Sequence, residues 1–234
     1  MSNLARPGRL ARFARSSIGR KLLMALTGLG LVGFLVVHMA GNLQMFQEPG
    51  AMNGYAAWLK SHTGVLWAAR LGLLGIFGLH VATGIQLSAE NREARPQAYE
   101  GRQNLRSTAA GRTMLYSGLL LLAFVVFHLA HFTLGLVQPE PFALHDALGQ
   151  HDVYRMVIAG FKVPGIAGVY LAAMAVLVFH LYHATRSVWQ TLSLNHPAYI
   201  DALRLASSAL TFVIVIGFAS IPLAVATGLI GGKP

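Results

Sequence analysis

Long apolar stretches alternate with short polar connections along the whole chain. Five stretches reach the roughly 20 residues that a helix needs to cross a bilayer. They run over residues 22–44, 64–88, 113–137, 164–188 and 205–230. The ten-residue blocks of alternating polarity that are typical of a transmembrane β-barrel do not occur. The pattern therefore predicts an all-α integral membrane protein, a single membrane domain over residues 1–234, with five transmembrane helices of which the first four form a bundle.

The composition agrees with this pattern. Of the 234 residues, 55% are hydrophobic and 11% are charged, whereas soluble domains carry about 25% charged residues. The polar connections are too short to form a separate water-soluble domain. The chain has no cysteine, which excludes disulfides, thiol chemistry and iron–sulfur ligation by this chain.

The N-terminal segment is basic and leads directly into the first apolar stretch. A cleaved signal peptide has a short apolar core followed by a cleavage site. Here the apolar stretch has the length of a membrane span, and "GNLQMF" follows it. We therefore expect the first helix to be retained as a membrane span.

Positive charge is concentrated on one side of the predicted topology. The N-terminus, residues 89–112 and the connection between the fourth and fifth helices carry 13 of the 18 basic residues, whereas the 8 acidic residues divide evenly between the two sides. The 13 residues, which we call the basic inner face, are Arg6, Arg9, Arg12, Arg15, Arg20, Lys21, Arg92, Arg95, Arg102, Arg106, Arg112, Arg186 and Arg204. Because cytoplasmic loops carry an excess of Lys and Arg, the N-terminus is predicted to be cytoplasmic and the C-terminus to lie outside.

The basic inner face suggests two kinds of partner. Juxtamembrane basic residues bind anionic membrane lipid, and a charged surface can also dock a soluble protein of complementary charge. The basic inner face can bind lipid and a soluble protein at the same time. Nucleic acid is not expected as a partner, because no recognised binding fold or aromatic platform accompanies the charge.

Six of the ten histidines lie inside the predicted spans. At a rise of 1.5 Å per residue, His38 and His128 lie about 24 and 22 Å from the inner ends of the first and third helices. His80 and His180 each lie about 12 Å from the inner ends of the second and fourth helices. The four histidines are therefore predicted to form an outer pair, His38 with His128, and an inner pair, His80 with His180.

Two facing imidazoles on separate helices of a bundle are what bis-histidine haem ligation requires. Iron would satisfy one nitrogen of each ring, and a carbonyl or hydroxyl group would accept from the other. A single membrane histidine more often bonds only to a neighbouring helix, but four at two matched depths favour two haems. A structural zinc site needs four close ligands, and these two pairs are more than a helical turn apart in depth.

Further polar residues lie near the predicted membrane faces. His131 and His183 follow His128 and His180 by three residues, at about 27 and 7.5 Å from the inner ends, and could serve a haem propionate or a quinone or simply be polar interfacial side chains. The additional candidates for the propionates of an inner haem, for which a plain topological role is the alternative, are Arg20, Lys21 and Arg186.

Specific stretches carry a resemblance to a known family. "SSIGRKLLMALTGLGLVGFLVVHMAGNLQMF", "LHVATGIQLSAENREARPQAY", "FHLAHF" and "FHLYHATRSVWQTL" resemble the first four helices of the di-haem cytochrome b membrane-anchor subunit of bacterial succinate:quinone oxidoreductases. This family includes the five-helix anchors of succinate dehydrogenase and fumarate reductase, and the similarity covers nearly the whole chain. Ala184 and Ser193 depart from it, since the family often has glycines there.

The resemblance implies a subunit of a respiratory complex in the bacterial inner membrane. A flavoprotein subunit would oxidise succinate or reduce fumarate, and an iron–sulfur subunit would pass electrons to two b haems in this anchor. His80 and His180 would ligate the proximal haem iron, and His38 and His128 the distal one. The electron carrier in the membrane would be a quinone, menaquinone being usual for this group.

The residues alone leave other functions open. A di-haem anchor of a hydrogenase or formate dehydrogenase also uses bis-histidine haems, although the second helix and its inner loop argue against it. A haem-free anchor or a small transporter with histidine relays would need no paired depths. If quinone reacts near the outer haem, the ionisable or polar candidates at that level, with His131 preferred as proton donor, are Asn42, Gln44, Lys60, His62 and His131.

Overall fold

The computed structural model describes residues 8, 12–13, 16–94 and 113–232. Several members of the charge pattern therefore lie outside the described residues, namely Arg6, Arg9, Arg15, Arg95, Arg102, Arg106, Arg112 and Lys233.

Five helices are long and apolar enough to cross a membrane, which confirms the predicted all-α architecture. They are α2 (Ser17–Asn42), α4 (Thr63–Glu93), α6 (Met114–His128) with its π-helical continuation η2 (Leu129–Thr133), α9 (Pro164–Thr191) and α10 (Ile200–Ala226). The first span begins at residue 17 rather than 22, because the Ser16 side chain accepts a hydrogen bond from the Gly19 N–H and caps the helix.

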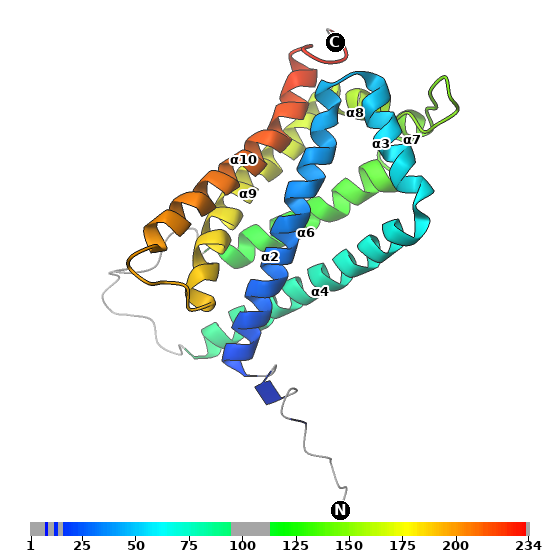
Figure 1. Ribbon diagram of the computed structural model, residues 1–234. Helices are drawn as coiled ribbons and strands as arrows, with labels where there is room; N and C mark the ends of the chain where they lie inside the picture. The colour runs from blue at the N-terminus through cyan, green and yellow to red at the C-terminus, as the bar shows by residue number, and fades with distance from the viewer. Residues whose placement is uncertain (1–7, 9–11, 14–15, 95–112, 233–234) are drawn as a thin grey trace, which may run out of the picture.

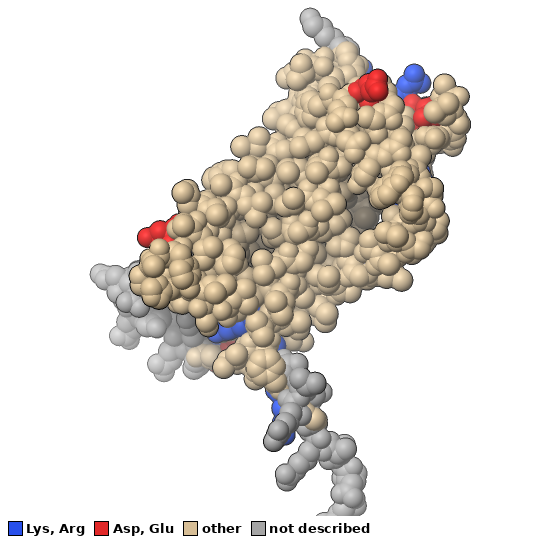
Figure 2. Space-filling view, viewed as in Figure 1, with Lys and Arg blue, Asp and Glu red and all other residues tan. Residues whose placement is uncertain are grey.

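The short elements lie at one end of the bundle (Figure 1). They are η1 (Leu43–Phe46), α3 (Pro49–Ser61), α7 (Pro139–Phe142) and α8 (Val153–Phe161). The C-terminus lies at this end and the N-terminus at the opposite end (Figure 1). In Figure 2 the charged side chains of the visible face lie at the two ends, and the surface between them is uncharged, as a membrane-spanning protein requires. We call the end with the short elements the outer end.

Helix α9 is at the centre of the packing. It packs most extensively against α10 and also against α6 and α2, whereas α4 packs mainly on α2 and has little contact with α6. In the apolar window of α4 no residue is buried, compared with 39% of the residues in that of α10. The four helices that carry the predicted ligands therefore form an open bundle, with α4 at its edge (Figure 1).

A buried polar network ties the outer cap together. The Asn53 side-chain amide on α3 donates to Asp152 at 3.1 Å and to Asp146 at 3.3 Å, and its oxygen accepts from the Tyr154 N–H. Asp152 also caps α8 by accepting from the Arg155 N–H. Asn53 and Asp152 are both buried, and the hydrogen bond between them ties α3 to α8 at the outer end of the bundle.

Candidate functional site

The four predicted ligand histidines lie on four different helices, and the outer two are in contact. His38 on α2 and His128, the last residue of α6, have ring centroids 5.9 Å apart with an interplanar angle of 83°. Phe34 stacks on His38 at 5.1 Å, and Phe218 lies 5.7 Å from the same ring. Phe124 lies 6.0 Å from His128. The outer pair is thus surrounded by apolar rings.

The inner pair lies on the other two helices. His80 is on α4, which packs on α2, and His180 is on α9, which packs on α6. Each ring rests against a glycine of a neighbouring helix. A Cβ at Gly28 would be 3.4 Å from His80 Cε1, and a Cβ at Gly118 would be 3.4 Å from His180 Cε1. These glycines on α2 and α6 allow both rings to sit directly against the helix backbone.

A hydroxyl next to each glycine fixes the orientation of the adjacent ring. Thr27 Oγ1 lies 3.1 Å from His80 Nδ1, and Ser117 Oγ lies 3.0 Å from His180 Nδ1. Thr27 donates its own hydrogen to the Leu23 carbonyl at 2.7 Å, and Ser117 donates to the Met114 carbonyl at 3.0 Å.

The hydrogen bonds to the helix carbonyls bear on which group donates in the contact between each hydroxyl and its histidine ring. A hydroxyl carries one hydrogen, so when Thr27 and Ser117 give theirs to the helix carbonyls they accept from the rings, and both Nδ1 atoms carry the proton. In a neutral imidazole the other nitrogen, Nε2, then has a free lone pair. This arrangement of hydrogen bonds is compatible with the tautomer that binds a metal through Nε2.

His128 has a partner of the same kind. Its Nδ1 lies 3.3 Å from the Tyr170 hydroxyl of α9, which also lies 3.0 Å from Nδ1 of His131. His38 differs, because its contacts are with Asn42 one turn later: the amide nitrogen donates to the His38 carbonyl at 2.7 Å and lies 3.3–3.4 Å from the ring nitrogens.

The two additional histidines occupy different environments. His131 in η2 is only 2% exposed, and its Nε2 lies 2.9 Å from Gln138 Oε1, so both ring nitrogens have partners. His183 is half-buried on α9, one turn after His180.

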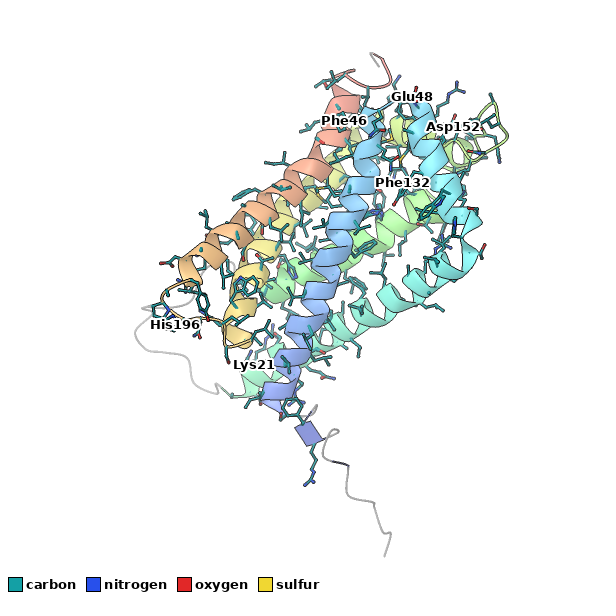
Figure 3. All side chains as sticks on the ribbon, viewed as in Figure 1. Lys21, Phe46, Glu48, Phe132, Asp152 and His196 are labelled. Atoms are coloured by element: carbon teal, nitrogen blue, oxygen red, sulfur yellow. The ribbon has the colours of Figure 1, made fainter. Side chains whose placement is uncertain are left out.

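The predicted cations at the inner end are engaged to different degrees. Arg20 forms an ion pair with Glu90 at 2.8 Å, which joins α2 to α4, but its buried Nε has no hydrogen-bond partner. Lys21 is exposed at the N-terminal end of the bundle (Figure 3). Arg186 donates to Tyr182 and Ser208, each at 3.1 Å. Of the three, Arg20 retains a buried donor for an anionic group.

The separation of the outer pair is compatible with two imidazoles binding one metal ion. An imidazole nitrogen binds a first-row metal at about 2 Å, so two nitrogens on opposite sides of one ion are about 4 Å apart. Ring centroids lie behind their nitrogens, and the 5.9 Å separation of the outer pair agrees with this requirement. Within the described ranges no three or more His, Cys, Asp or Glu residues converge as a metal site, and axial ligation needs only two protein ligands per iron.

Sequence reasoning missed the residues that orient the rings. Thr27, Ser117 and Tyr170 are polar groups inside apolar helices, which was a usable signal. Their partners could not be assigned from sequence, because the rotation of each helix about its axis decides which histidine a hydroxyl meets.

Comparisons with protein-family models, with curated proteins and with solved structures found no match to this chain.

Proposed function

We propose that this chain is the membrane-anchor cytochrome b subunit of a succinate:quinone oxidoreductase. It would bind two b haems, one through His38 and His128 and the other through His80 and His180. The observation that carries the proposal is the contact between Nδ1 of each inner histidine and the hydroxyl of Thr27 or Ser117, which allows each Nε2 atom to remain free for a metal.

Residues next to the two histidine pairs would also help to hold the cofactor. Phe34 and Phe218 would help to exclude water from the outer pair, and Gly28 and Gly118 give the inner rings the space that a Cβ would take. Arg20 would direct its unpartnered Nε toward a carboxylate at the inner membrane face. Bound haem would supply one-electron transfer between an iron–sulfur subunit and a membrane quinone.

The arrangement in the membrane is part of the same proposal. The N-terminus would lie in the cytoplasm of a bacterium, where the basic inner face would dock the iron–sulfur subunit, which in turn carries the flavoprotein subunit. Quinone, menaquinone in the related group, would react near the outer pair. Asn42 is within hydrogen-bonding reach of His38, and Lys60 and His62 are exposed at the junction of α3 and α4.

The experiment is purification of the intact complex through a tag on this chain. Its subunits are identified by mass spectrometry, and a reduced-minus-oxidised visible spectrum is recorded. We expect flavoprotein and iron–sulfur subunits, together with the spectrum of b-type haem. A haem-containing complex with hydrogenase or formate dehydrogenase subunits would retain the cofactor and reject the succinate assignment. A haem-free chain would reject the whole proposal.

A further inference from the structure

The Tyr170 hydroxyl joins the predicted outer ligand His128 to a second histidine. Tyr170 is 7% exposed and His131 is 2% exposed. The hydroxyl lies 3.3 Å from His128 Nδ1 and 3.0 Å from His131 Nδ1. On its other side, His131 Nε2 lies 2.9 Å from Gln138 Oε1. These contacts form one continuous chain from α6 through α9 and η2 to the loop at the outer end.

The chemistry of Gln138 sets the direction of this chain. An amide oxygen can only accept, so Nε2 of His131 donates to it. Nδ1 of neutral His131 is then an acceptor, and the single hydrogen of Tyr170 must go to it. The Tyr170 oxygen is left to accept from His128 Nδ1. As in the inner pair, Nε2 of His128 therefore carries a free lone pair.

The local backbone is built around this chain. In η2 the Leu134 N–H donates to the Leu129 carbonyl at 2.9 Å, a π-helical bond that inserts one extra residue into the turn carrying His131. Gly160 of α8 closes over the far end, where an added Cβ would lie 3.2 Å from His131 Nε2 and 3.3 Å from Gln138 Oε1. The π turn and the glycine place and enclose the two polar groups in an apolar region.

We infer that Tyr170, His131 and Gln138 are positioning residues that hold His128 in the Nε2-coordinating tautomer, an inference that rests on the proposed function. A group that accepts a hydrogen bond from the non-ligating nitrogen of a ligating histidine fixes the orientation of the ring and raises the basicity of the ligating nitrogen. A more basic ligand stabilises the oxidised iron, so the chain lowers the reduction potential of the outer haem. The inner pair has no such chain, since Thr27 and Ser117 each end on a helix carbonyl.

The test compares Tyr170→Phe with wild type in the intact complex. The readouts are the haem-to-protein ratio, the midpoint potential of each haem by redox titration, and the low-spin electron paramagnetic resonance signals. The outer haem is assigned as the one that His38→Ala removes. Gln138→Leu breaks the far end of the chain, and Gln138→Glu, which keeps an accepting oxygen, is its conservative partner.

We expect Tyr170→Phe to raise the potential of the outer haem, to shift its resonance signal and to weaken haem retention by about 10- to 100-fold. Gln138→Leu should change the outer haem in the same direction, and Gln138→Glu should restore it. An unchanged inner haem shows that the variants are folded. If both haems have the same retention, potential and resonance signal in Tyr170→Phe as in wild type, this inference alone is overturned. The same holds if the variant shifts the potentials of both haems equally. Wild-type protein without haem would overturn the proposed function as well.

Discussion

Replacement of Thr27 by Val tests the orientation of the inner pair most selectively. Valine has nearly the same shape, and Thr27 is only 6% exposed, so the packing between α2 and α4 is preserved while the acceptor for His80 Nδ1–H is lost. A buried N–H left without an acceptor costs about 1–3 kcal/mol. At about 1.4 kcal/mol per factor of ten, the inner haem should be held about 5- to 140-fold more weakly.

Thr83→Val is the matched control. Thr83 lies on α4 one turn after His80, is 4% exposed, and has no side-chain hydrogen bond to another described residue. The assay is the haem-to-protein ratio during stepwise washing of the purified complex, combined with a redox titration. We expect early loss and a raised potential of the inner haem in Thr27→Val only. Equal haem retention and equal potentials in the two variants would refute the proposed role of the Thr27 hydroxyl.

Three further predictions concern charged groups. Burial is the main cause that lowers the pKa of His151 below its ordinary 6.5, and its buried Nδ1 has no partner. The unfolded chain therefore binds more protons than the folded one, and stability should fall as the pH drops below 6.5. The drop in unfolding temperature between pH 7 and pH 5 should be larger in wild type than in His151→Gln. Arg20→Gln should lower the reduction potential of the inner haem in a redox titration. Glu90→Gln, which removes the same ion pair but keeps the cation, should not lower it. Because the ion pair is partly exposed, either change should alter the unfolding temperature little. Charge reversal at the exposed Arg92 should release the soluble subunits at lower salt, measured by their retention on the tagged anchor, and retention equal to wild type at every salt concentration would leave Arg92 without a docking role.

The membrane architecture could be predicted from the sequence because each span is a long apolar run with few charges. The five predicted helices all occur, and their ends differ by several residues where a local cap such as Ser16 or a polar extension such as residues 89–93 continues the helix. The depth of each histidine was predicted by counting residues along its helix. The contact between the rings of His38 and His128 agrees with their nearly equal predicted depths.

The polar partners of the rings depend on features that counting does not capture. Thr27 meets His80 only because α2 and α4 pack with those faces together. His131 is buried in the π turn of η2 beside Tyr170, and its predicted position near a membrane face stays a prediction. Its proposed part in quinone chemistry stays a prediction, and the positioning role is our inference from its contact with Tyr170. The buried link between Asn53 and Asp152 joins segments about a hundred residues apart, and no local pattern indicates it.

Haem counting in single-histidine variants of the purified complex tests the proposed ligation most directly. We predict two b haems per chain in wild type, loss of the outer one in His38→Ala and in His128→Ala, and loss of the inner one in His80→Ala and in His180→Ala. His183→Ala, three residues from His180 on the same helix, is the control and should keep both haems. Loss of a haem in His183→Ala together with full haem content in His180→Ala would show that the proposed ligands are wrong.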